Sequence, residues 1–216
     1  MRQHPFSMVE ILLALGVVAI GICSIMVLFP IGATATRDAE VVNYASQAAD
    51  QLLSVLKYNL TYDKSVTGKS KTAWDKVDAL TTVAQTDIES ACTAAQANLS
   101  SGWVAPSSTN SILGGEITSG NLFVPQSTTN AQIFLLVSRS DGNTSIADLD
   151  TAATNGQIDF KAIATLTRQQ IRVGSNDLPY TMGARFVLEI RWPVELPYSA
   201  QQSEEYILEI MKPTFE

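Results

Sequence analysis

The chain contains 216 residues and has a formal net charge of −7, because 21 acidic residues outnumber 14 basic ones. This length suits one ordinary core together with an additional element. The acidic residues are spread along the chain and no basic stripe is visible, which argues against nucleic-acid binding over a broad surface.

The most distinctive feature near the N-terminus is an apolar segment at 11–35, which holds no charged residue. It is longer than the roughly 20 residues that cross a bilayer core as a helix and longer than the apolar region of a signal peptide, about 7–15 residues. We therefore predict a transmembrane helix that stays in the mature protein. Arg2 precedes this helix and a mixed-charge stretch at 37–40 follows it, so the positive-inside rule places the N-terminus in the cytoplasm.

Glu10 is a carboxylate among apolar residues at the start of this segment. Near the centre of a membrane helix an acidic side chain costs about 2.5–3.5 kcal/mol, and it costs less near the interface. Two interpretations are open. The side chain reaches the lipid head groups without a further role, or its charge has a use.

The residues Phe6-Ser7-Met8-Val9-Glu10, followed by the apolar segment, resemble the processing and methylation site of type IV pilins and pseudopilins. The resemblance implies that a prepilin peptidase cuts before Phe6, that the new amine of Phe6 is methylated, and that Glu10 guides assembly. Pairing of the Glu10 carboxylate with the Phe6 amine of a neighbouring subunit would offset two charges buried among apolar helices.

The residue before this predicted cut is Pro5, where the family strongly prefers Gly. Proline fixes φ and lacks a backbone donor, which would hinder a peptidase that expects a small, flexible residue. An uncleaved leader would leave the protein anchored in the membrane and unassembled.

Pro30 and Gly32 lie late in the apolar segment. A proline inside a helix costs about 3 kcal/mol, so we predict a kink or a melted turn over 29–32. These two residues resemble the helix-weakening residues of pilin stems. A plain kink without mechanical meaning is the alternative.

After this point the pattern predicts a one-sided helix over 37–60. Its apolar residues recur at steps of three and four, which places them on one face of a helix. They are Ala45, Ala49, Leu52, Leu56 and Leu60.

The segment 61–157 is polar and rich in small residues, and we interpret it as an insertion. Within it, 73–99 is compatible with one or two short helices, and 131–138 has the pattern of a buried strand. Asp141, Asn143, Asp148 and Asp150 form the best candidate for a calcium site, because calcium takes closely spaced carboxylate and amide oxygens. A solvated turn is the alternative interpretation.

Alternating or β-branched residues predict strands at 157–167, 184–192 and 205–212. The tripeptide Leu-Glu-Ile occurs in both of the last two, which suggests neighbouring strands of one antiparallel sheet joined by a loop at 193–203. We predict an α+β fold in which a long N-terminal helix, transmembrane in its first half, packs on a C-terminal antiparallel sheet, as in pilins. The predicted parts are a leader (1–5), a transmembrane and assembly helix (6–36), its amphipathic continuation (37–60) and an extracytoplasmic domain (61–216).

Catalytic residues are scarce in this chain. The single histidine, His4, lies in the predicted leader, which removes His-based triads and the usual catalytic zinc sites from the mature protein. Cys92 has no neighbouring base and lies in an Ala-rich segment, so we interpret it as an inert packing residue. We expect no enzymatic activity and, calcium aside, no cofactor.

The functional hypothesis is a minor pilin or pseudopilin of a type IV pilus or a type II secretion filament, inserted in a bacterial inner membrane. Its expected partners are other pilin or pseudopilin subunits, the prepilin peptidase, the inner-membrane assembly platform and the lipid bilayer, with no nucleic acid. The rival is a single-pass anchored binding module that is not assembled into a filament, which the residue Pro5 favours.

Overall fold

The computed structural model describes residues 7–61, 74, 77, 80, 82–97, 99–106, 113, 122–126, 132–140 and 146–212. The chain divides into two compact units, Met1–Asn43 and Tyr44–Glu216. The division falls inside a helix. The described part of the first unit is helical after Ser7, and the second unit holds the end of that helix together with the strands.

The N-terminal helix α1 runs over Met8–Thr61 without interruption. Its buried residues all lie in the second unit, at Ala45, Ala49, Leu52, Leu56, Asn59 and Leu60. The predicted apolar stripe is therefore confirmed in full. Asn59 is the one addition, and its Nδ2 donates a hydrogen bond to the carbonyl oxygen of Leu113.

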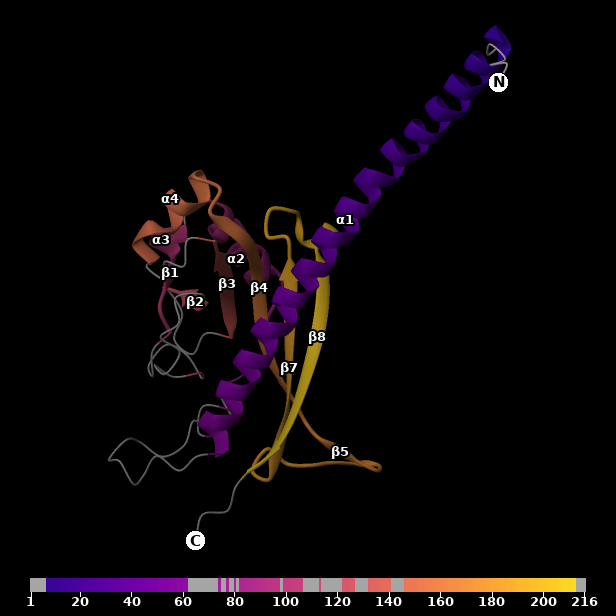
Figure 1. The fold of residues 1–216 in the computed structure, drawn as a ribbon. Coiled ribbons are helices and arrows are strands. Elements are labelled where there is room, and N and C mark those ends of the chain that lie inside the picture. Colours follow the sequence, from indigo (N-terminus) through magenta and orange to yellow (C-terminus); the bar gives the residue numbers. More distant parts are fainter. Residues whose placement is uncertain are drawn as a thin grey trace. The chain divides into compact units, whose positions relative to one another are not determined.

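The second unit is built on an antiparallel six-stranded sheet with the order β1-β2-β3-β4-β7-β8. The protein is therefore α+β (Figure 1). The predicted strands at 131–138, 157–167, 184–192 and 205–212 are confirmed as β3, β4, β7 and β8. The strands are β1 Trp103–Val104, β2 Leu122–Pro125, β3 Ile133–Arg139, β4 Ile158–Gln169, β7 Gly183–Trp192 and β8 Gln202–Met211.

The two faces of the sheet carry different layers, as two residues on opposite faces of β4 show. Phe160 faces α1, and its ring stacks on Tyr44 with centroids 6.0 Å apart. Ile163, three residues further along the strand, points to the other face and packs in a cluster with Leu135 and the α2 residue Ala95. Figure 1 shows α1 and α2 on opposite sides of the sheet.

The layer on the second face is made by short helices from the polar segment 61–157. They are α2 Gln85–Ala97, α3 Leu99–Gly102, η4 Ile146–Asp148 and α4 Leu149–Thr154. The helix expected within 73–99 is thus present as α2. The same segment also supplies β1, β2 and β3, so it completes the sheet in addition to covering it.

Two smaller elements complete the described part of the chain. The strands β5 Arg172–Val173 and β6 Asn176–Asp177 form a separate hairpin between β4 and β7. Gly174 in its turn has φ of 65°, a left-handed conformation that favours glycine. The 3-10 turn η5 Tyr198–Ala200 lies in the loop between β7 and β8.

Candidate functional site

The N-terminal end of α1 is closed by two reciprocal hydrogen bonds between Ser7 and Glu10. The backbone N–H of Ser7 donates to Glu10 Oε2 at 3.0 Å, and the N–H of Glu10 donates to Ser7 Oγ at 3.3 Å. This arrangement is a capping box, in which two backbone donors without helical partners are satisfied by side chains. The Ser-x-x-Glu spacing before an apolar segment signals it, but it was not recognised from the sequence. Glu10 thus has a local role that neither earlier interpretation included.

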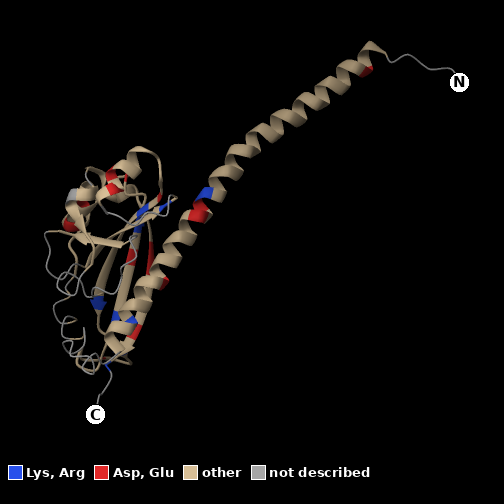
Figure 2. Cartoon of the chain, turned by 60° about the vertical axis from the view of Figure 1, so that its left-hand side comes forward, with Lys and Arg blue, Asp and Glu red and all other residues tan. Residues whose placement is uncertain are grey.

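The apolar part of α1 is exposed on all sides within the first unit. Its large side chains from Met8 to Ile31 are exposed, among them Phe29 at 77%. Figure 2 shows no charged residue on the helix between the acid of its first turn and the group near its middle. By length and composition, α1 can cross a membrane, and it is the one such helix in the described part of the chain. Pro5, Phe6 and His4 lie outside the described residues.

Pro30 and Gly32 do not interrupt α1, which is helical through both positions. The melted turn, one of the two predicted alternatives, is therefore absent, and the kink stays a prediction. Pro30 removes a single backbone hydrogen bond, and the long helical stretches on both sides hold the turn, because helix propagation is favourable once nucleated. Two hydroxyls also bond to carbonyls here: Thr34 Oγ1 donates to the oxygen of Ile31 at 2.9 Å and Thr36 Oγ1 to that of Gly32 at 3.0 Å.

Comparison with known proteins does not assign the chain. No protein-family model, curated protein or solved structure matches it. The resemblance to pilins therefore rests on the N-terminal residues alone.

In the second unit, Asp150 connects two of the short helices. Its carboxylate accepts hydrogen bonds from the N–H groups of Leu99 at 2.7 Å and Ser100 at 3.3 Å, and from Ser100 Oγ. These donors lie at the start of α3, whereas Asp150 lies in the first turn of α4. Burial raises the pKa of Asp150, but the hydrogen bonds from Ser100 and Leu99 outweigh it, and the net effect lowers the pKa below its ordinary value of 3.8.

This geometry bears on the calcium candidate. Asp141 and Asn143 lie outside the described residues, while Asp148 and Asp150 lie within them. Both oxygens of Asp150 are engaged by donors from α3, so this carboxylate acts as a helix cap. Among the described residues there is no group of three or more His, Cys, Asp or Glu side chains that could hold a metal ion.

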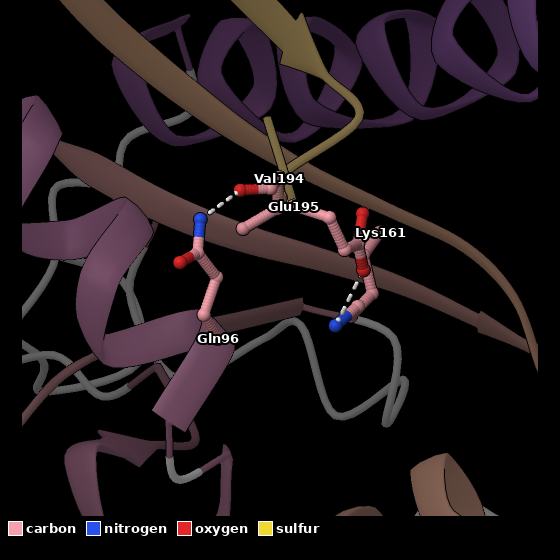
Figure 3. Close-up of polar contacts among 4 residues, drawn as sticks. All are labelled: Gln96, Lys161, Val194 and Glu195. Carbon is pink, nitrogen blue, oxygen red and sulfur yellow. Dashed lines mark hydrogen bonds and ion pairs between the residues drawn. The ribbon is translucent and has the colours of Figure 1, made fainter. Parts of the chain in front are cut away.

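The loop 193–201 between β7 and β8 folds over the α2 side of the sheet and is fixed by polar contacts (Figure 3). Gln96 of α2 donates its Nε2 to the carbonyl of Val194 at 2.5 Å, and Lys161 of β4 forms an ion pair with Glu195 at 2.7 Å. The Lys161 side chain is 14% exposed and that of Glu195 56%. The ion pair thus joins a largely buried lysine side chain to an exposed carboxylate.

Three further contacts hold the second half of this loop. Gln201 Nε2 donates to the carbonyl of Leu196 at 3.0 Å and lies 3.5 Å from Cys92 Sγ. The Arg191 guanidinium lies over the Tyr198 ring, 4.1 Å from its centroid, a cation–π contact. Cys92 is buried on α2 and packs in the core cluster, which agrees with its interpretation as a packing residue. The loop is a structural connection between the helical layer and the sheet.

Proposed function

We propose that the protein is a structural subunit, a minor pilin or pseudopilin, of a type IV pilus or a type II secretion filament. One observation carries the proposal. The motif from Phe6 to Glu10 spans the start of α1, which is apolar and exposed on all sides in the first unit, and the same helix ends as one layer of an α+β domain.

The exposed apolar surface supports both a membrane-inserted and an assembled form. Side chains such as Phe29 and Leu28 need an apolar surrounding, which either a bilayer or the apolar helices of other subunits can supply. In this proposal the N-terminus lies in the cytoplasm and the domain lies outside the inner membrane. Its partners are other subunits, the prepilin peptidase and the assembly platform.

Glu10 has two separable roles in this proposal. Its carboxylate closes the capping box with Ser7 inside its own helix. Its charge would pair with the methylated amine of Phe6 in a neighbouring subunit, which sets the register between subunits. The first role needs a hydrogen-bond acceptor, whereas the second needs a negative charge.

Processing is tested by the intact mass of the membrane-extracted protein and of its N-terminal peptide, from a host with an active prepilin peptidase. We expect a chain that begins at methylated Phe6. A chain that still begins at Met1, while a control pilin is processed in the same cells, would refute assembly by this route.

Assembly is tested with two matched variants. Glu10→Gln keeps an acceptor for the capping box and removes the charge, while Ser7→Ala keeps the charge and removes the hydroxyl. The proposal expects loss of filament incorporation in Glu10→Gln and near-normal incorporation in Ser7→Ala, measured by immunoblot of sheared filaments. The reverse pattern would assign Glu10 a capping role only.

The second candidate is an anchored extracytoplasmic binding module that uses α1 for retention in the membrane. Two observations favour it: Pro5 stands where the peptidase prefers Gly, and the Glu10 carboxylate already has a partner within its helix. This candidate expects an unprocessed chain and no incorporation of any variant into filaments.

A further inference from the structure

The strand β8 forms one edge of the six-stranded sheet and is unusually long for an edge. It pairs with β7 in a continuous register of residue pairs from Trp192–Gln202 to Gly183–Met211. No other strand pairs with its outer side in the part of the chain that the structure describes. The opposite edge, β1, has two residues. A long edge strand presents a row of backbone N–H and C=O groups that another strand can bind.

The sequence of β8 lacks two of the features that commonly protect such an edge. It contains no proline, which would remove a donor, and no Lys, the charge most often used to prevent pairing. Its charged residues are three acids, Glu204, Glu205 and Glu209. The edge is thus protected by acids alone, so its charge discourages an acidic strand and admits a basic one.

The three carboxylates differ in their surroundings. Glu209 pairs with Arg185 of β7, and Glu204 accepts a hydrogen bond from the Tyr206 hydroxyl at 2.6 Å. Glu205 is exposed and lies directly opposite Glu189 of β7, whose carboxylate is already in an ion pair with Arg191. Among the described residues the Glu205 carboxylate has no basic partner of its own. A positive charge from a strand added beside Glu205 would supply one.

These charges decide what kind of strand fits. A second copy of β8 would place its glutamates beside those of the first, and neither strand contains a Lys or Arg to compensate them. Pairing between two copies of β8 is therefore disfavoured. Glu205, Ile207 and Glu209 alternate along β8 and therefore share one face of the sheet, and Ile207 is 58% exposed. An added strand with Lys or Arg, then an apolar residue, then Lys or Arg at alternate positions would complement all three.

We infer that the outer edge of β8 binds an extended basic segment of another protein, which joins the sheet as an additional strand. Backbone hydrogen bonds to β8 provide attachment, and the alternating basic and apolar side chains provide selectivity. The inference is independent of filament assembly, because it concerns the second unit alone.

The test uses the full-length protein in phosphatidylcholine nanodiscs, whose neutral surface does not attract a basic peptide. The probe is a fluorescent Thr-Lys-Thr-Val-Thr-Lys-Thr peptide, and binding is followed by fluorescence polarisation. We expect saturable binding of this peptide and at least about fivefold weaker binding of the same peptide with Glu in place of Lys, the factor that corresponds to ~1 kcal/mol for a cross-strand charge pair.

A charge-exchange variant provides the matched control. Glu205 is exposed, so Glu205→Lys is expected to fold, which circular dichroism and the thermal midpoint check. In this variant the Lys peptide should bind about fivefold more weakly and the Glu peptide more tightly than to the wild type. Equal affinities of both peptides for both proteins would overturn the inference.

Backbone pairing is tested separately with two N-methylated peptides, each methylated at one of the two sets of alternate amides. Only one set of amides in an added strand faces β8. Methylation of that set should abolish binding, and methylation of the other should leave it unchanged. The inference is wrong if both N-methylated peptides bind like the unmethylated parent, or if neither of them binds. It is also wrong if the protein dimerises through β8 in sedimentation experiments.

Discussion

Replacement of Asp150 by alanine should destabilise the second unit by about 1–2 kcal/mol. The carboxylate accepts three hydrogen bonds from Leu99 and Ser100 at the start of α3. Loss of a helix-capping side chain costs about 0.5–2 kcal/mol, and the half-buried position of Asp150 lets water replace part of what is lost. For a unit of this size such a loss lowers the thermal midpoint by about 2–8 °C.

The assay is thermal unfolding of the full-length protein in detergent, followed by near-ultraviolet circular dichroism of the tryptophans. Trp103 is suited to this because it is buried and follows α3 directly. Asp159→Ala serves as the control, since Asp159 is an exposed acid on β4. Each protein is measured with calcium and with EDTA.

The pH dependence of this effect has a defined sign. The pKa of Asp150 is lowered in the folded protein, so its stabilising effect is complete above the ordinary value of 3.8 and is lost as the pH falls through the lower folded pKa. The difference between wild type and Asp150→Ala should therefore be constant near pH 6–7 and shrink in acid. If EDTA lowers the wild-type midpoint to that of the variant, Asp150 binds calcium and the capping interpretation is refuted.

Three further predictions concern the second unit. Leu56→Ala should lower the free energy of unfolding by about 2–5 kcal/mol, because Leu56 is fully buried. The control Lys57→Ala changes an adjacent exposed residue and should alter this free energy little. Equal losses of unfolding free energy for the two variants in denaturant titrations would contradict the burial of Leu56. Gln96→Leu should cost about 1–3 kcal/mol by leaving the Val194 carbonyl without its donor, and an unchanged denaturation midpoint would show that water replaces it. Burial, then the hydrogen bond and charge of Glu204, raises the pKa of Tyr206 to about 12. Spectrophotometric titration should therefore show a tyrosine that ionises above the usual 10 and is lost in Tyr206→Phe, with stability lost as the pH rises towards 12; a titration curve unchanged by this substitution would refute the contact.

Periodic features of the fold could be predicted from the sequence. The stripe from Ala45 to Leu60 and the strands β3, β4, β7 and β8 were found because burial on one face imposes a period of 3.6 or 2 on apolar residues. The two Leu-Glu-Ile strands are neighbours in the sheet, as predicted. The two-residue strand β1 is too short to show any period.

Features that depend on distant or competing interactions were not predictable in this way. Asp150 finds its donors about fifty positions earlier in the chain, and no local pattern reports such a contact. At Pro30 the local cost of proline predicted a kink or a melted turn, and the long helix on both sides of it excludes the melted turn. The capping box of Ser7 and Glu10 is different, because its Ser-x-x-Glu signal was present in the sequence.

The strand order of the main sheet follows the order of the chain, apart from the β5–β6 excursion. Each strand of the sheet therefore meets, on emerging during synthesis, a neighbour that has already been made, and the sheet can grow by one strand at a time from β1. The apolar stripe on α1 precedes all of these strands in the chain, so it must wait for the strands that it packs on, β4 among them, before its face is covered. β8, the last of these six strands in chain order, is the longer of the two edges that the sheet leaves open.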